Sequence, residues 1–581
     1  MKVLLATLNA RYTHSSLALA YLQAACRDPR WELIKREFTI NDKLPGVLAE
    51  IYRIRPQVLC LSSYIWNIRQ IVELCNDYRQ LDPNCIMVLG GPEVSFDSRQ
   101  FLAEHPAIDI IVRGEGELTL KKLLLHIYEG RSYAELKGIS FRDQEQVRVN
   151  DAAPLIDDIS AWPRPYSGDM SFYQNKLVYY ETSRGCPFNC SYCISSTIKG
   201  VRFLPLERVQ EDLSFLIRHR VNKIKFVDRT FNSHEKRALA IMQYILDEIG
   251  EERTTSFHFE ICADLLSEAA LAFLEQVPPG VFDFEIGVQS TCPLTLKAIN
   301  RLNDWEKLAC NVKKIKSYGN IHLHLDLIAG LPYEDYQRFG QSFNQVFELQ
   351  ADVIQLGFLK LLKGSPIYQE KDRYGYKFQR LAPYQVLANN YMDYQDLCRL
   401  QDIEELVEHY YNSGIFTKSL DYLVNRVYQG NAFKALEDFS LYWRRQGWYE
   451  RPQARDSLYI SLACFVKEKH PAHFEWANEW FKYDYLLNNR VYKVPDALPR
   501  YKPEEARQKM DSLLSDKAFL EHYLPEFCGK SLRELKKYVY LEYLNLNQDQ
   551  GNRTYHPVLF LYHPGKQKSY KSIIVHESDN N

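Results

Sequence analysis

Over the first 130 residues, short apolar runs alternate with amphipathic stretches. The apolar runs predict buried strands at 2–8, 57–64, 85–91 and 108–117. The other stretches predict helices, the first over 15–28 with a serine cap and the second over 67–83, ended by a proline. Apolar strands that alternate with helices indicate an open parallel α/β sheet, which binds ligands at the carboxyl ends of its strands. The loops at those ends are 9–16, 62–67, 90–95 and 113–117.

The middle of the chain repeats this alternation after an interruption. Prolines at 154, 163 and 165 and the local pattern indicate a small strand pair and then a connector. Strands are predicted at 176–185, 222–228, 256–262, 281–290, 321–330 and 353–362, with helices at 234–250, 267–276, 293–300 and 305–317. These six units are fewer than the eight of a full barrel, so we expect a partial (βα)6 barrel.

From about 377 the periodicity is mainly helical. Helices are predicted within 384–412, 416–430, 431–447 and 454–469, and a strand pair at 558–563 and 571–577. The predicted fold class is α/β with four regions. They are a Rossmann-like domain over 1–137, a connector over 138–172, a partial barrel over 173–376 and a mostly α-helical domain over 377–581.

Composition excludes some functions without naming one. The chain has 581 residues, 46% hydrophobic and 25% charged, with a formal net charge of −2, so no overall basic field favours nucleic acid or anionic membrane. No apolar run reaches membrane-spanning length, and the apolar start predicts a strand, not a signal peptide. Most of the 13 cysteines are scattered, unlike a secreted disulfide framework. We therefore expect a cytoplasmic protein.

Three cysteines are the exception to this scatter. Cys186, Cys190 and Cys193 follow the strand predicted at 176–185, in the stretch "ETSRGCPFNCSYC". A closed zinc site usually takes four protein ligands, whereas three thiolates suit a [4Fe–4S] cluster with one iron left open. A zinc loop or chance clustering is the alternative interpretation.

This CxxxCxxC stretch, with Tyr192 before the last cysteine, resembles the signature of the radical S-adenosylmethionine (SAM) superfamily. The resemblance implies that Cys186, Cys190 and Cys193 are the catalytic metal ligands and that the open iron chelates SAM. An electron from the cluster would then split SAM into methionine and a 5′-deoxyadenosyl radical.

Polar positions at later strand ends are similar to the SAM contacts of that family. The predicted contacts are Tyr192, Asp228, Glu260, Glu285, Gln289, Ile328 and Gly330. Asn232 and Asp264 occupy comparable positions, and Asp326 and Glu334 fall in "DLIAGLPYE", a degenerate form of a family motif. Structural capping of strand ends is the alternative for each polar residue.

The first domain resembles the cobalamin-binding domain found before many radical SAM cores, through "LCLSSYIWN", "VLGGPEVS" and "VRGEGE". Its predicted cobalamin contacts are Arg11, Tyr12, His14, Ser62, Ser63, Tyr64, Trp66, Gly90, Gly91, Pro92, Glu93, Gly114 and Glu115. Gly90-Gly91 would let the backbone approach the cofactor closely. The DxHxxG motif of cobalamin carriers is incomplete here, so for His14 a hydrogen-bonding role is favoured over ligation of cobalt.

Together these resemblances imply a cobalamin-dependent radical SAM enzyme with an uncharacterised helical extension. Its cofactors would be a [4Fe–4S] cluster, SAM and cobalamin, and its electron donor a flavodoxin or ferredoxin. The reaction would be methyl transfer, cyclisation or rearrangement; the substrate stays open, and nucleic acid and membrane partners are not expected. In the extension, 409–414 and the basic aromatic stretch 442–455 are more simply helix ends than ligand sites.

Two other functions compete. A tRNA methylthiotransferase would need a second cluster on three cysteines of the first domain, where Cys26, Cys60, Cys75 and Cys85 are not expected to meet at strand ends. A cofactor-dependent sensor would share the fold without cleaving SAM.

Overall fold

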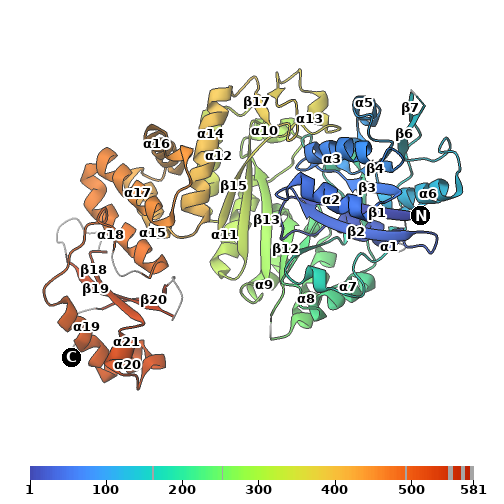
Figure 1. Ribbon diagram of the computed structural model, residues 1–581. Coiled ribbons are helices and arrows are strands. Elements are labelled where there is room, and N and C mark those ends of the chain that lie inside the picture. Colours follow the sequence, from blue (N-terminus) through green and yellow to red (C-terminus); the bar gives the residue numbers. More distant parts are fainter. Residues whose placement is uncertain are drawn as a thin grey trace. The chain divides into compact units, whose positions relative to one another are not determined.

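The computed structural model describes residues 1–144, 146–156, 158–159, 162–251, 253–490, 494–546, 554–563 and 569–575 (Figure 1). The chain forms two compact units. The first comprises Met1–Phe339, Leu349–Ala351 and Gly357–Leu397, and the second comprises Gly340–Glu348, Asp352–Leu356 and Cys398–Asn581. No helix in the described ranges has both the length and the apolar character needed to cross a membrane.

A seven-stranded sheet in the order β2-β1-β3-β4-β5-β6-β7 opens the first unit. Its strands are β1 (Lys2–Asn9), β2 (Glu32–Thr39), β3 (Val58–Ser62), β4 (Ile86–Gly90), β5 (Ile110–Val112), β6 (Ile139–Asp143) and β7 (Gln146–Val149). The first five are parallel, and the β6–β7 hairpin joins β5 antiparallel. The strand pair predicted beside the connector therefore extends this sheet.

Helices cover both faces of this sheet, which explains its continuous apolar strands. One face packs against α1 (Leu17–Ala25) and α6 (Gly116–Glu129). The other packs against α2 (Leu44–Ile54), α3 (Ile68–Leu81) and α5 (Ser98–Glu104), and the short α4 (Pro92–Ser95) follows β4. Ser16 caps α1, as predicted, by accepting a hydrogen bond from Leu19 N. The prediction missed β2, because this edge strand pairs only with β1 and mixes charged with apolar residues.

The second large sheet has the order β15-β14-β13-β12-β11-β8, and the boundary between the two units runs through β15. Its strands are β8 (Leu177–Tyr180), β11 (Lys223–Phe226), β12 (Ser256–Ile261), β13 (Phe282–Gln289), β14 (His322–Ala329) and β15 (Val353–Phe358). Neighbouring strands from β8 to β14 are parallel and consecutive along the sheet. This open run of six strands confirms the predicted partial (βα)6 barrel.

Apolar and polar residues alternate along these strands. Ile261 and Phe284 lie against α8 and α9, whereas His258, Glu260 and Glu285 occupy the opposite face, called here the polar face. The accompanying helices are α7 (Leu206–Arg218), α8 (Glu235–Ile249), α9 (Glu268–Glu275), α10 (Pro293–Ala298), α11 (Trp305–Tyr318), α12 (Tyr336–Phe347) and α13 (Pro366–Gln369). A small β16 (Lys377–Phe378)–β17 (Val386–Ala388) pair follows.

The second unit is mostly helical. Its elements are α14 (Tyr394–Leu406, which begins in the first unit), α15 (Thr417–Tyr422), α16 (Ala432–Arg445), α17 (Arg455–Lys469), α18 (Pro471–Asn488), α19 (Ala506–Ser515), α20 (Lys517–Tyr523) and α21 (Leu532–Leu535). Its sheet has the order β18 (Val539–Leu544), β19 (His556–Tyr562) and β20 (Ser569–Ile574), one strand more than predicted. Residues 576–577 of the predicted strand lie outside the described residues.

Two predicted features of this region differ in the structure. The helix expected from 384 begins at Tyr394, because the Asn389 side chain accepts hydrogen bonds from Tyr391 N and Met392 N, both at 2.8 Å, and holds a turn there. The segment 409–414 is largely π-helical, with Tyr410 buried and its hydroxyl donating to Leu458 O at 2.8 Å. Arg444 forms an ion pair with Asp402, in keeping with a solvated helix end.

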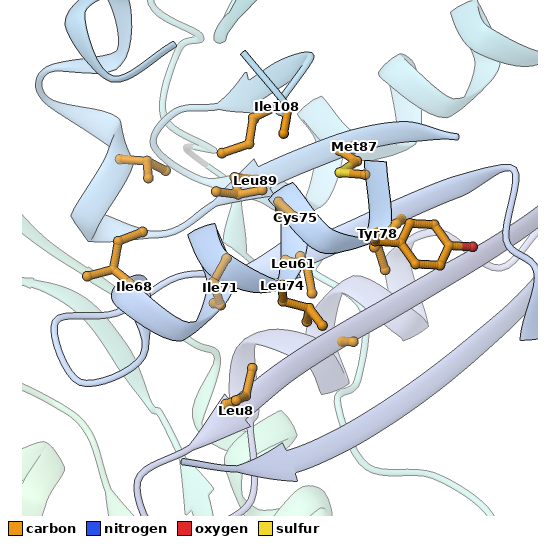
Figure 2. Packing of buried hydrophobic residues seen from close by; sticks show 14 of the residues in the cluster. Leu8, Leu61, Ile68, Ile71, Leu74, Cys75, Tyr78, Met87, Leu89 and Ile108 are labelled. Atoms are coloured by element: carbon orange, nitrogen blue, oxygen red, sulfur yellow. The ribbon is translucent and has the colours of Figure 1, made fainter. Parts of the chain in front are cut away.

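The core between the first sheet and α3 contains Leu61, Leu74, Met87 and Leu89, which point toward one another in Figure 2. These side chains have at most 2% of their surface exposed. Because they come from adjacent strands and one helix, the core fixes the strand ends that carry the glycines discussed below.

We predict that Leu89→Ala lowers the free energy of unfolding of the first sheet by about 2–5 kcal/mol, through lost burial and a residual cavity. Hydrogen exchange of the β3 and β4 amides in the cofactor-free protein would measure it. Leu81→Ala at the end of α3, where the side chain is 50% exposed, serves as the control and should change the value by less than about 0.5 kcal/mol. Equal effects of the two substitutions would contradict this core.

Candidate functional site

The three clustered cysteines lie on a loop shaped by the hairpin β9 (Ser183–Cys186)–β10 (Gly200–Phe203), which follows β8. Gly185 has φ +102°, and a Cβ there would lie 2.0 Å from the carbonyl oxygen of Gly200. Only glycine tolerates this contact. The hairpin therefore fixes the backbone immediately before Cys186.

The cysteine loop is compact. Cys190 is buried, and Cys186 and Cys193 are partly exposed. Cys193 N donates to Cys190 O at 3.1 Å, and Ser195 N lies 3.4 Å from Cys193 Sγ. Among the described residues, no three His, Cys, Asp or Glu side chains converge as ligands of one metal ion. A [4Fe–4S] cube takes each thiolate on a different iron, so its ligands stand apart, and the three thiols of this loop suit such a cluster.

Arg301, which the sequence did not reveal, lies beside this loop. Its Nη1 is 3.9 Å from Cys190 Sγ and 3.3 Å from Tyr192 OH, and its Nη2 donates to Gly287 O. Burial raises the pKa of Cys190, and the guanidinium opposes that shift. Arg301 stands in a loop 111 residues after Cys190, so no local motif marks it.

Among the predicted SAM contacts, Gln289 has a side-chain oxygen that is free to accept a hydrogen bond. It ends β13 with φ +69°, a conformation uncommon for a residue other than glycine. Its buried Oε1 has no hydrogen-bond partner among the described residues. The side chain approaches Gly287, to which Arg301 also donates. Gln289, Arg301 and Tyr192 thus form a polar group beside the cysteine loop.

Asp228 and Asn232 instead join strand ends. Asp228 accepts hydrogen bonds from Thr182 N at 2.9 Å, Thr182 Oγ1 at 2.7 Å and Ser183 Oγ at 2.5 Å. Asn232 bonds the backbone of Cys262 through both its amide nitrogen, at 2.8 Å, and its oxygen, at 2.9 Å. These partners favour the structural capping alternative for both residues.

Glu260 and Glu285 face each other across β12 and β13 but differ in their partners. Glu285 Oε2 lies 2.7 Å from Lys225 Nζ and 2.8 Å from His258 Nε2, whereas Glu260 Oε1 is 3.9 Å from the same lysine. Although burial opposes ionisation, His258 and Lys225 lower the pKa of Glu285 to about 2. Burial and the Glu285 charge raise the pKa of Glu260 to about 7. Glu285 is therefore an engaged anion, and Glu260 is the carboxyl that changes charge near neutrality.

The end of β14 carries the remaining predicted contacts. Ile328 lies on the polar face with Asp326, whose Oδ1 is 3.1 Å from His324 Nε2. Gly330 has φ +87°, and its carbonyl accepts from Tyr376 OH at 3.0 Å and Asn389 Nδ2 at 2.9 Å. Further along, Glu334 is buried and accepts from Ser290 Oγ at 2.7 Å, and Asp264 accepts from Cys262 Sγ at 2.9 Å.

The edge of the first sheet is shaped by Gly90 and Gly91. Gly91 has φ +112°, and a Cβ there would lie 2.2 Å from the carbonyl oxygen of Ser63. Ser63 in turn donates to Gly90 O from its backbone N at 2.8 Å and from its hydroxyl at 2.7 Å. The backbones after β3 and β4 are therefore held in direct contact, which only glycine at position 91 permits.

A cavity of about 130 Å³ opens beside these glycines. Its lining at the strand ends comprises Ser62, Tyr64, Gly90, Gly91, Gly114 and Gly116. Apolar side chains of α1 and α6, among them Leu19, Leu22 and Leu120, form the other walls. A mainly apolar cavity with a backbone-lined edge suits a flat, uncharged ring system.

Loop 9–16 lies against the start of β8. His14 Nδ1 is 3.3 Å from Tyr179 OH, and burial lowers the pKa of His14. Lys176 Nζ donates to Tyr12 O at 2.6 Å and lies over the exposed Tyr12 ring. Arg11 is exposed. The neutral His14 thus has a tyrosine partner, in keeping with the hydrogen-bonding role favoured above.

Four other predicted cobalamin contacts have partners within the protein. The Tyr64 and Trp66 rings are stacked 4.5 Å apart, and Trp66 Nε1 donates to Leu8 O at 3.2 Å. Glu93, which follows Pro92 at the start of α4, accepts a hydrogen bond from Tyr384. The Glu115 carboxylate turns to the cysteine hairpin, where it accepts from Arg202 Nη2 at 2.6 Å.

The four cysteines of the first domain divide between two cores. Cys75 and Cys85 lie in the core on the α3 face, and Cys26 and Cys60 lie in the core on the α1 and α6 face. Burial raises the pKa of each thiol. Because the sheet separates the pairs, no three of these thiols share one core.

Comparison with protein families assigns both parts of the first unit. The model "B12 binding domain" matches residues 3–124, and "Radical SAM superfamily" matches 180–346. A third model, "Protein of unknown function (DUF4080)", matches 372–560. The chain therefore carries a B12-binding domain followed by a radical SAM domain. It is a radical SAM enzyme whose cofactors are a [4Fe–4S] cluster, SAM and cobalamin.

Individual relatives agree with this assignment. An uncharacterised methyltransferase of Pyrococcus horikoshii is 27% identical over 61% of this chain and 78% of its own length. The cobalamin-dependent radical SAM methyltransferase TokK of Streptomyces tokunonensis is 27% identical over 53% of this chain, and the match spans 47% of TokK. The structure of the radical enzyme OxsB with aqua-cobalamin and SAM bound has a TM-score of 0.59, with 14% identity, over 82% of this chain and 80% of OxsB. At that identity OxsB supports the fold alone.

We predict that Glu260→Gln stabilises the cofactor-free protein relative to wild type as pH rises from 5.5 to 8. The folded-state pKa of Glu260, about 7, lies above that of the unfolded chain, so its stabilising contribution is complete at low pH and is lost as pH rises through 7. The relative gain should be about 1–3 kcal/mol. Thermal unfolding midpoints across this pH range would measure it, with Glu268→Gln, an exposed α9 residue, as the control. A pH-independent difference would contradict the pKa of Glu260.

Proposed function

We propose that the protein transfers a methyl group to a carbon atom of its substrate, using the cluster, SAM and cobalamin together. The observation that carries this proposal is the placement, within one compact unit, of the three-cysteine loop and the glycine-edged cavity, joined by direct side-chain contacts. The names of the Pyrococcus and Streptomyces relatives favour methyl transfer over cyclisation.

The cysteine loop would hold the cluster. Cys186, Cys190 and Cys193 supply three thiolates, and the fourth iron would be left for SAM. Arg301 beside Cys190 would hold the SAM carboxylate, because it is a guanidinium near the cluster and can form charge-assisted hydrogen bonds. Gln289, through its unpartnered oxygen, would accept from the SAM amino group.

The edge of the first sheet would hold cobalamin. Gly90 and Gly91 keep side chains away from this edge, and the apolar cavity behind it would receive the ring of the nucleotide tail. His14, neutral and bonded to Tyr179, would border the cofactor without ligating cobalt. When bound, the cluster and SAM supply the 5′-deoxyadenosyl radical and cobalamin supplies the methyl group.

The chain's own residues would position substrate and exclude water. On the polar face, Glu285 is engaged by Lys225 and His258, which leaves Glu260 as an acceptor for a polar substrate. Reduction of the cluster requires an external electron donor, which we propose to be a flavodoxin or ferredoxin, and we propose a cytoplasmic location.

We predict that Gly91→Ala weakens hydroxocobalamin binding at least tenfold. Its Cβ would displace the Ser63 backbone, and non-glycine residues strain φ +112°. Absorbance titration of the cobalamin-free protein would measure the Kd. Gly46→Ala is the matched control, since nothing lies within 4 Å of a Cβ there. Wild-type affinity in Gly91→Ala would exclude this edge as the cofactor site.

Anaerobic reconstitution with iron, sulfide, cobalamin and SAM tests the whole proposal. We expect about four irons per chain, and formation of both 5′-deoxyadenosine and S-adenosylhomocysteine once substrate is supplied. Deoxyadenosine alone in the presence of substrate would instead indicate cyclisation or rearrangement. About eight irons would favour a methylthiotransferase, and an intact cluster with no SAM cleavage would favour a sensor.

Two variants separate the roles within this experiment. Cys190→Ala should lose the cluster and both products. Arg301→Gln should keep about four irons but raise the KM for SAM at least tenfold, because the charge-assisted contact is lost. An unchanged KM in Arg301→Gln would remove this residue from the SAM site.

A further inference from the structure

Arg184, two residues before Cys186, is enclosed by acidic and aromatic side chains. Its Nη2 donates to Glu117 Oε1 at 2.5 Å and to Glu181 Oε1 at 2.7 Å. The guanidinium carbon lies 3.5 Å from the centre of the Trp162 ring, and the side chain is 16% exposed. The residue is therefore fixed on several sides immediately before the first cluster ligand.

Unlike Glu181, the partner Glu117 comes from the B12-binding domain, and so does Glu115, whose Oε1 lies 3.5 Å from Arg184 Nη1. Glu115 is the cap residue of α6 and Glu117 lies in its first turn, on the segment that also provides Gly114 and Gly116 to the cavity. Glu117 itself lines that cavity. Any ligand that fills the cavity will therefore contact the helix turn that Arg184 holds.

A second arginine repeats the contact. Arg202 on β10 is the register partner of Arg184 on β9, and it donates to Glu115 Oε1 at 2.6 Å and to Ile156 O at 2.8 Å. Glu115 also accepts from Ile156 N at 2.9 Å. The guanidiniums of Arg184 and Arg202 on the hairpin thus form ion pairs with the carboxylates of Glu115 and Glu117 at the start of α6.

The backbone between Arg184 and Cys186 has little freedom to move. Gly185 separates Arg184 from Cys186 and packs so closely against Gly200 that a Cβ at position 185 would lie 2.0 Å from the Gly200 carbonyl oxygen. Removing one partner of a buried ion pair leaves an uncompensated charge, so arginines and carboxylates must move together. A displacement of the first turn of α6 is consequently passed to the backbone of Cys186.

We propose that Arg184 and Arg202 are positioning residues that couple cobalamin binding in the cavity to the iron–sulfur loop. This inference rests on the proposed function, since it requires cobalamin in that cavity and the cluster on that loop. Coupling of this kind is reciprocal: the cluster increases affinity for cobalamin by the same factor as cobalamin favours the cluster-loaded loop.

The test measures the Kd of hydroxocobalamin for the full chain with the cluster and for the full chain without it. The cluster-free form is the variant in which Cys186, Cys190 and Cys193 are all replaced by alanine. The ratio of the two Kd values reports the coupling. Wild type should bind at least about fivefold more tightly with the cluster, at the low end of measured couplings. Arg184→Lys and Glu117→Gln should each reduce this ratio to within about twofold of one. Their combination should reduce it no further, because the two residues act as one pair.

Arg164→Lys is the matched control. Arg164 likewise joins two carboxylates, Glu211 and Asp212, but contacts neither α6 nor the cysteine hairpin through those pairs. It should keep the wild-type ratio. Glu117→Gln lies outside the cysteine loop and should load the cluster even if Arg184→Lys does not.

The outcomes separate the two proposals. The coupling is overturned if the ratio of the two hydroxocobalamin Kd values is one in the wild-type protein. It is also overturned if Arg184→Lys and Glu117→Gln both keep the ratio of the wild type. In either case cobalamin binding itself stands. No uptake of hydroxocobalamin by any form overturns the proposed function and the coupling together. As a second measurement, cobalamin should shift the electron paramagnetic resonance spectrum of the reduced cluster in wild type and not in Glu117→Gln.

Discussion

In a parallel sheet, ligands are bound by the loops at the carboxyl ends of the strands, and both large sheets of this protein follow that constraint. Because helices cover the apolar faces, the strand ends are where backbone and polar side chains are free to meet a ligand. In the first sheet the tips of β3 and β4 meet at Gly91 and Ser63. In the second, the loop after β8 carries the cysteines and the end of β13 carries Gln289. The chemistry therefore gathers at sheet edges although it is scattered in sequence.

Charge is distributed on the polar face by register. Glu260 and Glu285 are cross-strand partners, and two carboxylates at such spacing cannot both ionise freely. Contacts with Lys225 and His258 keep Glu285 ionised, and burial together with the charge of Glu285 keeps Glu260 protonated up to about pH 7. A strand pattern in the sequence shows that both residues share a face, but it does not show which one has the lysine.

The sequence predicts the parts of this protein that depend on local spacing. Each of these features, namely the buried strands, the Ser16 cap and the cysteine loop, is encoded by residues that lie close together in the sequence. Arg301 could not be found this way, because only folding brings it to Cys190 across 111 residues. Edge strand β2 cannot be distinguished from a loop by its mixed pattern, and the bonds of Asp228 to Thr182 and Ser183 are made only in the folded chain.

Glu115 illustrates the same limit with a larger consequence. In sequence, "GEGE" belongs to the first domain alone, and an acidic residue between glycines at a strand end suggests a ligand contact. In the folded protein that carboxylate accepts a hydrogen bond from Arg202 of the radical SAM domain. Burying charges is costly unless they are paired, so Glu115 and Glu117 require the arginines of the cysteine hairpin as much as those arginines require them. The loop after β5 and the cysteine hairpin are therefore joined by buried, charged hydrogen bonds that neither segment could make alone.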